Sequence, residues 1–448
     1  MPQPEREQWS TRLGFVMAAV GSAVGLGNMW RFPYLTAENG GAAFVLLYIL
    51  TTVFIGLPIM LAEFTLGRGS KRSPIQALAS FGGDGWKPLG GLFVAAGFLI
   101  LAYYGVIAGW TFRYAADAVF HGFAGSPAAR FQAAAGGWDA VLWQVLFMGA
   151  TIAIVAAGVR GGIERTSLVL MPALALIVIG LDVYAATLPG AGAGYAFYLK
   201  TSFADVLSWR VLADAAGQAF FSLSLGMGAM LTYASYLSRD DDLPQEAVVI
   251  AGSNFAFAFV AGLMVFPIIF AFGLSGEVGE SAVGALFISL PKAFASIGAA
   301  GRIVGFLFFT AMLVAALTSA LSLLEVVASS AIDGLGWSRR TAALVCGGLI
   351  TALGIPAAFD LDILDLMDKV AGNVLLLVGG FFLAIFVGWV APDPTGEVRK
   401  GASSTGWLPA WRGFLRWVVP ALLLIVLWFS TQEAWDSLTT LVSHLTGG

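Results

Sequence analysis

The sequence predicts an all-α, polytopic membrane protein, and three observations lead to this fold class. Hydrophobic residues make up 58% of the chain, charged residues only 11%, and the mean hydropathy is +0.85. A soluble domain would have about a quarter of its residues charged. The apolar residues also gather in runs of about 20, the length of a helix that crosses a bilayer core. The net charge of -4 gives no basic patch, so nothing favours nucleic acid as a partner.

Eleven apolar runs predict eleven transmembrane helices. They cover about 12–37, 41–67, 88–120, 141–159, 166–187, 211–237, 245–273, 301–331, 339–356, 362–391 and 409–430. An odd number of spans places the two termini on opposite sides of the membrane. With the N-terminus inside, the inner segments hold about twice as many Lys and Arg residues as the outer ones. The positive-inside rule therefore predicts a cytoplasmic N-terminus and an external C-terminus.

Two of these spans are interrupted. Residues 21–31 of the first span read GSAVGLGNMWR, which places glycines, an amide and a cation where a spanning helix is normally continuous. Residues 222–228 of the sixth span, SLSLGMG, contain a second interruption of this kind about 200 residues later. Interrupted segments at matching places in two halves of a membrane chain indicate the midplane site of a secondary transporter.

The other spans complete two halves of a single transporter domain over 1–448. Spans one to five cover about 11–187, and spans six to ten cover about 211–391. Because five is odd, the second half is inverted relative to the first, an arrangement that lets one bundle rock around a fixed central site. The eleventh span, about 409–430, lies outside the repeat. It follows a polar loop at 392–404.

The interruptions need a binding partner, because an unpaired backbone group in hydrocarbon costs several kcal/mol. The carbonyl end of a half-helix suits Na+ or an ammonium group, and the amide end of the next suits a carboxylate. Together they fit a zwitterionic amino acid with cations. The nearby side chains are hydroxyls and amides, oxygen ligands of a hard cation: Ser22, Asn28, Ser222, Ser224, Asn254, Thr318 and Ser319. Close helix packing is the other reading of such small residues.

Several motifs give the chain a resemblance to a known family. They are Trp9 with Arg12, residues 21–28, the Arg31-Phe32-Pro33 triplet, Glu38-Asn39-Gly40-Gly41, Tyr103-Tyr104, residues 218–224 and Leu317-Thr318-Ser319. The chain resembles the neurotransmitter:sodium symporter family, in particular its bacterial amino acid transporter branch. The resemblance implies the LeuT-like fold, with broken helices 1 and 6. Most of the family has twelve spans, whereas this chain stops after eleven, as multi-hydrophobic amino acid transporters do.

The resemblance implies two sodium sites and a substrate site. The first sodium site would use the Ala23 carbonyl, Asn28, Ser222, Asn254 and the substrate carboxylate. The second would use the carbonyls of Gly21, Val24 and Ala315 with the hydroxyls of Thr318 and Ser319. The substrate would contact Ser22, Ala23, Leu26, Gly27, Tyr104, Phe221, Ser224 and Met227, with Ile100, Ser319 and Leu323 around its side chain. Tyr104 would donate to the carboxylate, and Phe221 would be the lid.

Two positions bear on the substrate class. Members of the family that transport biogenic amines carry an aspartate at the position of Gly25, where it replaces the carboxylate that their ligands lack. Glycine here favours amino acids. Met227 stands where the leucine transporter has a phenylalanine, and because methionine adapts to varied apolar shapes, we expect a pocket that admits bulky or aromatic side chains. The predicted function is therefore sodium-coupled symport of hydrophobic or aromatic L-amino acids by alternating access.

The resemblance also implies gates and a release path. Arg31 with Asp368 would form the outer gate, and Arg6 with Asp333 the inner gate, beneath Trp9 and beside Tyr236 and Glu325. The release path would open where the stretch from Gly162 to Pro172 unwinds, because proline removes a helix hydrogen bond and glycine lowers the cost of unwinding. A simple kink and ordinary anchoring charges are the alternative readings.

Chloride dependence stays open. Tyr48, Gln218, Ser222 and Asn254 match the positions that surround chloride in animal members, but Ala258 replaces both the serine of chloride-dependent members and the glutamate of many independent ones. Glu63 and Asp214 could supply the negative charge, or they could be structural carboxylates paired with amides. The resemblance to the bacterial branch of the family favours chloride independence and a location in a bacterial plasma membrane.

Three other function classes compete with a transporter. We find no carbonyl-ring filter motif of an ion channel. A sensor would keep the pocket but would need an output domain, which the sequence does not predict. An intramembrane enzyme would need a nucleophile with a base or a metal cluster, and we find neither, so we do not expect an enzyme. The single cysteine, Cys346, lies in an apolar run and is expected to be a packing residue.

Overall fold

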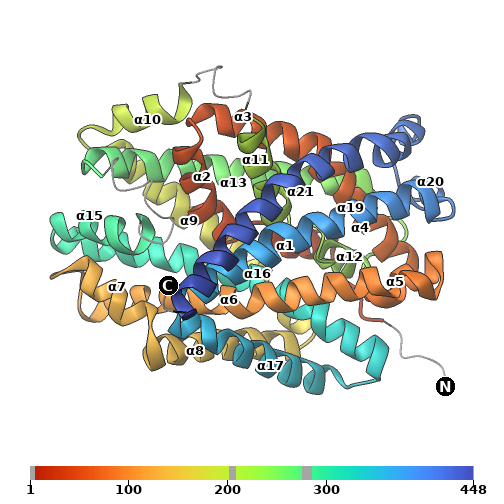
Figure 1. The fold of residues 1–448 in the computed structure, drawn as a ribbon, viewed down its shortest axis with the longest axis horizontal. Helices are drawn as coiled ribbons and strands as arrows, with labels where there is room; N and C mark the ends of the chain where they lie inside the picture. The colour runs from red at the N-terminus through yellow and green to blue at the C-terminus, as the bar shows by residue number, and fades with distance from the viewer. Residues whose placement is uncertain (1–5, 201–207, 275–284, 447–448) are drawn as a thin grey trace.

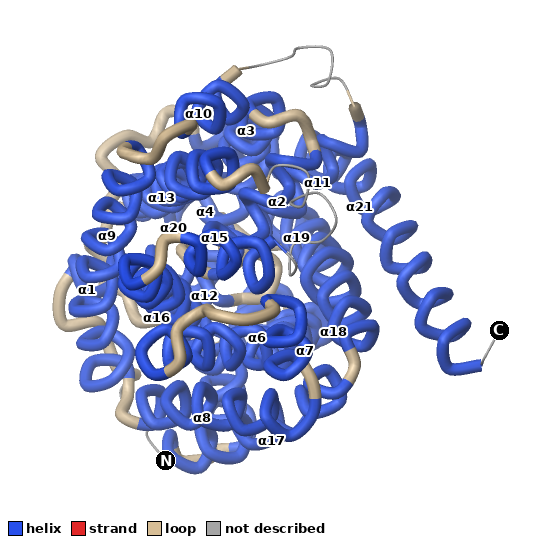
Figure 2. The backbone as a smooth tube through the Cα atoms, turned by 90° about the vertical axis from the view of Figure 1, so that its left-hand side faces the viewer, coloured by secondary structure: helices blue, strands red, loops and turns tan. Residues whose placement is uncertain are grey.

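The structure, a computed structural model, describes residues 6–200, 208–274 and 285–446. Its helices run mostly along one axis (Figure 1), and Figure 2 views them from one end. The first half holds α1 Arg12–Ala23, η1 Gly27–Arg31, α2 Phe32–Glu38, α3 Ala42–Thr51, η2 Thr52–Gly56, α4 Leu57–Ser70, α5 Pro74–Gly82, η3 Asp84–Trp86, α6 Lys87–Phe120, α7 Pro127–Ala135, α8 Gly137–Ala156, η4 Val159–Glu164, α9 Arg165–Ala186 and α10 Ala191–Leu199.

The rest of the described chain also alternates long helices with short connectors. It holds α11 Trp209–Ser222, α12 Ala229–Ala234, α13 Leu243–Ala271, η6 Ala285–Ser289, α15 Leu290–Ser296, α16 Ala299–Leu335, α17 Arg339–Phe359, α18 Leu361–Met367, η7 Asp368–Leu375, α19 Leu376–Ile385, η8 Phe386–Val390, α20 Pro394–Arg399 and α21 Leu408–Thr446. The short helices α5, α7, α10, α15 and α20 between the spans were not predicted from the sequence.

The count of eleven spans is not confirmed. In the described part of the chain, nine helices are long and apolar enough to cross a membrane, and the bent pair of α1 with residues 27–38 brings the number to ten. The predicted sixth span is divided between α11 and α12, which have 14 and 6 residues. Neither piece reaches the roughly 20 residues that a continuous spanning helix needs.

The last predicted span is longer than expected. The sequence predicts about 409–430, but α21 has 39 residues, which at 1.5 Å per residue is about 58 Å, nearly twice the thickness of a bilayer core. Hydropathy falls after residue 430, but helix formation does not stop where hydropathy falls. Figure 2 shows α21 along the edge of the bundle, and its C-terminal part still contacts α18, because Ser437 Oγ donates to Asp365 Oδ2 at 2.9 Å.

The centre of the bundle is formed by α6 and α16, which pack along each other and have 34 and 37 residues. Helices α8 and α17 pack on the outer side of α6, and α9 and α13 pack against α1. Each of the two broken segments faces this centre, so the breaks lie inside protein rather than in lipid, where their free backbone groups could not be satisfied.

Glycines explain where the two segments break. Helix α1 ends at Ala23, and the chain bends by 47° before it resumes at Gly27. In the second break, Gly226 and Gly228 have φ of +76° and +72°, which glycine adopts without strain. A Cβ on Gly226 would also lie 2.1 Å from the carbonyl oxygen of Leu376, so no other residue fits there. Ser224 has φ of +54° without that freedom, and such strain is typical of functional sites.

Candidate functional site

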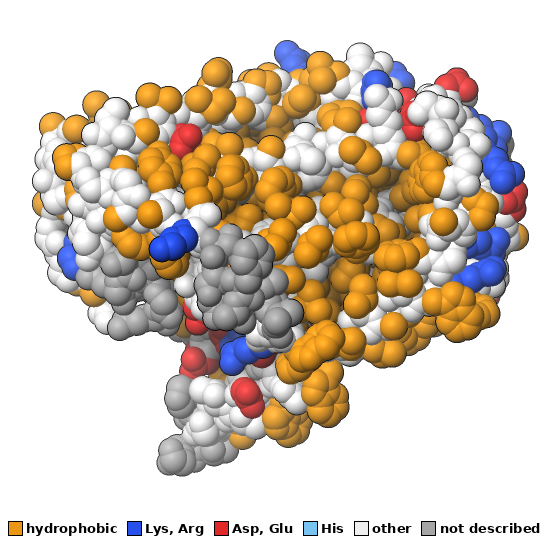
Figure 3. All heavy atoms as spheres, turned by 90° about the horizontal axis from the view of Figure 1, so that it is seen from above, with side chains coloured by type: hydrophobic (Ala, Val, Ile, Leu, Met, Phe, Trp, Pro, Cys, Tyr) orange, Lys and Arg blue, Asp and Glu red, His pale blue; other side chains and the backbone are white. Residues whose placement is uncertain are grey.

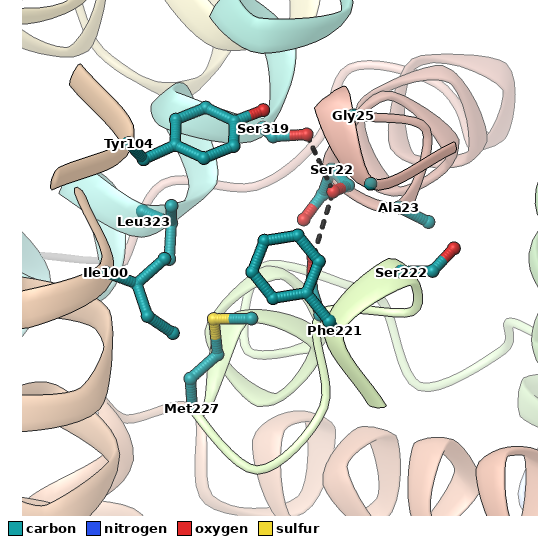
Figure 4. Close-up of a pocket in the computed structure, with 12 residues that line it drawn as sticks. Ser22, Ala23, Gly25, Ile100, Tyr104, Phe221, Ser222, Met227, Ser319 and Leu323 are labelled. Atoms are coloured by element: carbon teal, nitrogen blue, oxygen red, sulfur yellow. Dashed lines mark hydrogen bonds between the residues drawn. The ribbon is translucent and has the colours of Figure 1, made fainter. Parts of the chain in front are cut away.

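A pocket lies where the two breaks meet α6 and α16 (Figure 4). Twelve residues line it: Ser22, Ala23, Gly25, Gly27, Ile100, Tyr104, Phe221, Ser222, Ser224, Met227, Ser319 and Leu323. Of the predicted substrate residues, only Leu26 is absent from this lining, and its backbone N–H instead donates to the hydroxyl of Tyr104 at 3.2 Å. Gly25 also lines the pocket and was not predicted to do so, although it lies between the predicted substrate residues Ala23 and Leu26 in the sequence.

Serine hydroxyls satisfy the backbone that the first break sets free. The carbonyl oxygen of Ser22 accepts the hydroxyl of Ser224 at 2.9 Å and that of Ser319 at 3.0 Å (Figure 4). The hydroxyl of Ser22 pairs with that of Ser322 at 2.7 Å. These bonds join α1, the second break and α16 at one point, so a movement of one element is felt by the other two.

The predicted first sodium set forms one buried polar cluster. Asn28 Nδ2 donates to Asn254 Oδ1 at 2.7 Å, and Ser222 Oγ lies 3.0 Å from Asn254 Oδ1 and 3.2 Å from Asn28 Oδ1. Tyr48 completes it, with its hydroxyl 3.0 Å from Ser222 Oγ and 2.9 Å from Asn254 Nδ2. The Ala23 carbonyl accepts the Gly25 N–H at 3.1 Å. The structure thus gathers amide and hydroxyl oxygens from four helical segments beside the pocket.

The predicted second sodium set lies where α1 ends against α16. Thr318 Oγ1 donates to the Ala315 carbonyl at 3.1 Å, and Ser319 Oγ donates to the Gly21 carbonyl at 3.3 Å. A Cβ on Gly21 would lie 3.0 Å from Thr318 Cβ, so the two helices approach closely here. Val24 caps the C-terminal end of α1. Hydroxyl and carbonyl oxygens at a helix C-terminus suit a cation.

The pocket is closed. Its cavity measures about 20 Å³, room for about one water molecule. Phe221 lies across it, and the guanidinium of Arg31 lies 5.1 Å from the centre of the Phe221 ring. Ile100, Met227 and Leu323 form its apolar end (Figure 4). An amino acid therefore enters only when Phe221 and the neighbouring walls move apart.

The predicted outer pair is not formed. Arg31 and Asp368, both described, make no ion pair in this structure. Arg31 Nη2 instead donates to Asn373 Oδ1 at 2.5 Å, and Asp368 Oδ1 accepts the hydroxyl of Tyr103 at 2.8 Å. Residues 368–375 form the π-helix η7, whose wider turn places residue 373 near residue 368, while the Asp368 carboxylate is directed to Tyr103. An α-helical period gives no reason to single out Asn373.

The predicted inner pair is formed. Arg6 Nη1 lies 2.7 Å from Asp333 Oδ2, and its guanidinium lies 4.8 Å from the centre of the Tyr236 ring. Burial lowers the pKa of Arg6, but the charge of Asp333 and the hydrogen bond to it outweigh burial, so the pKa is raised and the guanidinium stays charged. Trp9 covers this side, with Nε1 donating to the Tyr233 carbonyl at 2.9 Å.

A second charged contact, which the sequence did not predict in full, continues the inner cluster. Glu325 is fully buried, accepts the Tyr236 hydroxyl at 2.5 Å and pairs with Arg339 at 2.8 Å. Arg339 also lies 3.3 Å from a carboxylate oxygen of Glu7. Glu325 was expected beside Tyr236. No spacing in the sequence links Arg339 to Glu325.

The stretch from Gly162 to Pro172 is wound. Gly162 lies in the π-helix η4, and Pro172 lies inside α9. A Cβ on Gly162 would lie 1.9 Å from the carbonyl oxygen of Ile154, so the close turn requires glycine. The residues just before α1 hold this segment: Glu164 accepts the backbone N–H of Ser10 at 2.9 Å. The predicted release path is thus a wound segment fastened to the N-terminal chain.

Glu63 and Asp214 both face amides. The buried carboxylate of Glu63 accepts the backbone N–H groups of Gly226 at 2.8 Å and Leu231 at 3.0 Å, and so fastens the second break. Asp214 accepts the side-chain amide of Asn39 at 3.1 Å. Gln218 Nε2 donates to the Gly27 carbonyl at 2.8 Å. These contacts support the interpretation of Glu63 and Asp214 as structural carboxylates that are paired with amides.

Comparison with known proteins agrees with this geometry. The family model of the sodium:neurotransmitter symporter family matches residues 6–125 and 133–439. The chain belongs to the sodium:neurotransmitter symporter family. It is similar to a sodium-dependent transporter of Haemophilus influenzae, 34% identical over 456 residues, covering 94% of this chain and 97% of the relative. The sodium-dependent transporter YhdH of Bacillus subtilis is also 34% identical, covering 95% of this chain and 98% of its own length.

A solved structure extends the likeness to three dimensions. The crystal structure of MhsT in complex with L-phenylalanine superposes with a TM-score of 0.87 and 43% sequence identity, covering 95% of this chain and all of that one. The predicted family and LeuT-like fold are therefore confirmed. As a member of a family of sodium-dependent symporters, the chain is a multi-pass membrane transporter that uses Na+, and it is not an enzyme.

Proposed function

We propose that this sodium:neurotransmitter symporter carries hydrophobic and aromatic L-amino acids, with alternating access to the two sides of the membrane. One observation carries the proposal: the pocket lining contains no carboxylate, yet an uncharged oxygen set of Asn28, Ser222 and Asn254 lies beside it. A cation at this uncharged set would be bound more strongly if a carboxylate oxygen joined its ligands. The carboxylate of an amino acid substrate can supply that oxygen. The ligand thereby becomes part of the sodium site, which couples the two binding events.

The apolar end of the pocket supports the hydrophobic part of the proposal. Ile100, Met227 and Leu323 offer no polar side-chain group to a ligand, so a charged or amide side chain would lose its hydration without compensation. MhsT, which has this fold and 43% identity, was solved with L-phenylalanine. We assign the α-carboxylate to the end near Tyr104 and the first break, and the side chain to the end near Met227.

We further propose two Na+ ions, one at each oxygen set. The first set supplies Asn28, Ser222, Asn254 and the Ala23 carbonyl. The second supplies Thr318, Ser319 and the carbonyls of Gly21, Val24 and Ala315. Sodium would stabilise the outward-open state, the amino acid would complete the first set and draw Phe221 over the pocket, and parting of Arg6 from Asp333 with unwinding from Gly162 would release both. Each ligand shifts the states only by its difference in affinity between them. Transport without chloride is part of the proposal.

The proposed topology has a cytoplasmic N-terminus, an external C-terminus and a bacterial plasma membrane location. The charge asymmetry of the loops supports it. The two halves, about 11–187 and 211–391, each contain one broken segment and form one domain over 1–448 as an inverted repeat. On this proposal α21 is the one span outside the repeat.

Uptake into proteoliposomes tests the function. Purified protein is given radiolabelled tryptophan or leucine with an inward Na+ gradient, and a K+ gradient serves as the matched control. Accumulation that needs Na+ and persists when gluconate replaces chloride is the expected result. Binding without any gradient-driven accumulation would replace the transporter by a sensor. Uptake of an amine without a carboxylate, at the same rate, would overturn the proposed substrate class.

A further inference from the structure

Two arginines near the start of α21 reach the same backbone carbonyl. Arg412 Nε lies 3.3 Å and Arg416 Nε lies 2.5 Å from the carbonyl oxygen of Gly388 in η8, and Arg412 Nη2 donates to the Ala391 carbonyl at 3.0 Å. These carbonyls end the helix, where its partial negative charge attracts cations. The two guanidiniums are therefore held beside each other at the junction of η8 and α21.

Close packing fixes this arrangement. A Cβ on Gly388 would lie 2.9 Å from Arg416 Cγ and 3.1 Å from its Cα, so α21 presses directly on the backbone of η8. Both arginine side chains are only partly exposed. The absence of a side chain at residue 388 is thus what lets two positively charged groups share one acceptor.

The charge of Asp393 acts on Arg412, but no ion pair joins the two side chains. Within residues 6–200, 208–274 and 285–446, no ion pair of Arg412 or Arg416 is found. Asp393, the acidic residue that begins the neighbouring helix α20, already accepts the N–H of Gly396 and the hydroxyl of Thr395, each at 2.9 Å. Nη1 of Arg412 and both Nη atoms of Arg416 have no acceptor among the described residues, so several N–H groups remain for an anion.

Exposed tryptophans flank the two arginines. The rings of Trp389 and Trp417 meet edge to face at 4.7 Å, and the guanidinium of Arg416 lies 5.4 Å from the centre of the Trp389 ring. These indoles are 50% and 66% exposed. Tryptophan prefers the headgroup depth of a membrane. Figure 3 shows a broad hydrophobic band beside Lys and Arg side chains gathered at the end where α20 lies.

We infer that the junction of η8 and α21 binds the headgroup of an anionic phospholipid. The phosphate oxygens would accept the free N–H groups of Arg412 and Arg416, since a guanidinium fork matches phosphate geometry, and the acyl chains would lie over Trp389 and Trp417. Basic pockets between transmembrane helices on the cytoplasmic side have this chemistry, and the proposed orientation places the junction there. The inference does not depend on which amino acid is carried.

Retention of phosphatidylglycerol, measured by native mass spectrometry of detergent-solubilised protein, tests the inference. The variant carries Arg412→Gln and Arg416→Gln. The matched control carries Arg165→Gln and Arg340→Gln, which remove the same charge from two exposed arginines elsewhere at the predicted inner ends of helices. We expect the dissociation constant for phosphatidylglycerol to rise at least 10-fold in the variant and less than 2-fold in the control, and phosphatidylcholine to bind weakly to all three proteins.

Two further arms keep the test decisive. The Arg412→Lys, Arg416→Lys variant keeps both charges and the fold while losing the planar fork, and it should lose part of the affinity. Inorganic phosphate at millimolar concentration should not displace the lipid, because it lacks the acyl chains that contact the indoles. Equal losses in variant and control would show general charge attraction and overturn the site. Full displacement by inorganic phosphate would make it a free-anion site and overturn the lipid assignment.

Discussion

Glu7 accepts the backbone N–H of Val159 through its carboxylate, at 2.6 Å. Val159 is the first residue of η4, and Glu7 follows Arg6 directly, so the chain that carries the inner ion pair also caps the segment that is expected to unwind. Glu164, at the other end of η4, accepts the N–H of Ser10. Residues 6–10, which we call the strap, therefore hold both the inner ion pair and the segment from Val159 to Glu164.

If the strap holds this segment, neutralising Glu7 or Glu164 should speed hydrogen exchange there and leave the rest of the protein unchanged. Glu7→Gln and Glu164→Gln each weaken a charge-assisted bond by about 1–2 kcal/mol, so amide hydrogen exchange over residues 159–171 should become roughly 5–30 times faster. Hydrogen–deuterium exchange with mass spectrometry in saturating Na+ measures this. Asp84→Asn, at a surface pair with Lys87, is the control. Unchanged exchange in both variants, or faster exchange everywhere, would contradict the strap.

The buried amide cluster predicts a sodium phenotype. Asn254→Ala removes one hydrogen-bond partner from each of Asn28, Ser222 and Tyr48 and costs about 1–3 kcal/mol, so the Na+ concentration for half-maximal amino acid binding should rise roughly 5–150-fold. Gln144→Ala is the matched control, since it removes a buried amide that bonds the Thr351 carbonyl and does not line the pocket. Equal Na+ dependence in the two variants would count against the first sodium set.

Met227 predicts the breadth of substrate choice. Met227→Phe adds a rigid ring to the apolar end of the pocket, where overpacking costs about 1–3 kcal/mol, so the ratio of tryptophan to leucine uptake should fall about 10-fold. Met227→Leu, which conserves volume, should change the ratio little. The ratio from competition uptake in proteoliposomes decides this, and a ratio that does not move in Met227→Phe would show that the ligand side chain points elsewhere.

Asn373, rather than Asp368, is predicted to hold Arg31 in the closed state. Asn373→Ala removes a hydrogen bond to a charged group, worth about 1.5–3 kcal/mol, so bound amino acid should leave roughly 10 times faster on dilution into Na+ buffer. Asp368→Asn keeps the contact with Tyr103 and should have the smaller effect. Stopped-flow measurement of dissociation compares the two, and the reverse order would show that Arg31 pairs with Asp368 in solution.

Lys71, just beyond the end of α4, predicts a pH effect on stability. Burial and the nearby charge of Arg68 lower its pKa to about 8, while the unfolded chain keeps the ordinary value near 10.4. Between these values the unfolded state binds more protons, so stability gains from rising pH. The melting temperature of wild type relative to Lys71→Gln should therefore increase from pH 7.5 to pH 9.5. A constant difference would contradict the lowered pKa.

The pocket was accessible from the sequence because its signals are local. A break in an apolar span, such as residues 21–28, leaves backbone groups that need a partner, and glycines and hydroxyls mark the place directly. The individual substrate residues came from the family resemblance instead, and ten of those eleven line the cavity. The inner pair of Arg6 and Asp333 followed from the family motif, although 327 residues separate the two.

Other contacts could not be predicted, because no regular spacing of residues in the sequence indicates them. Asn373 reaches Arg31 because η7 is wound as a π-helix, and an α-helical reading of the tenth span does not indicate that turn. The contact of Arg339 with Glu325 depends on how α16 and α17 meet after the turn between them. The length of α21 was missed because hydropathy stops at the membrane boundary, whereas helix formation does not.

The space around Gly25 restricts how this transporter can evolve. A Cβ at this position would lie 2.4 Å from the hydroxyl oxygen of Ser319 and 3.1 Å from that of Tyr104. An aspartate, as amine-carrying relatives have, would therefore collide with α16 before it reached a cation. A carboxylate at residue 25 therefore requires the Ser319 hydroxyl to turn away, and that hydroxyl is the group that holds the carbonyl oxygens of Gly21 and Ser22 at the end of α1. A change at residue 25 would thus loosen the first break as well as alter the pocket.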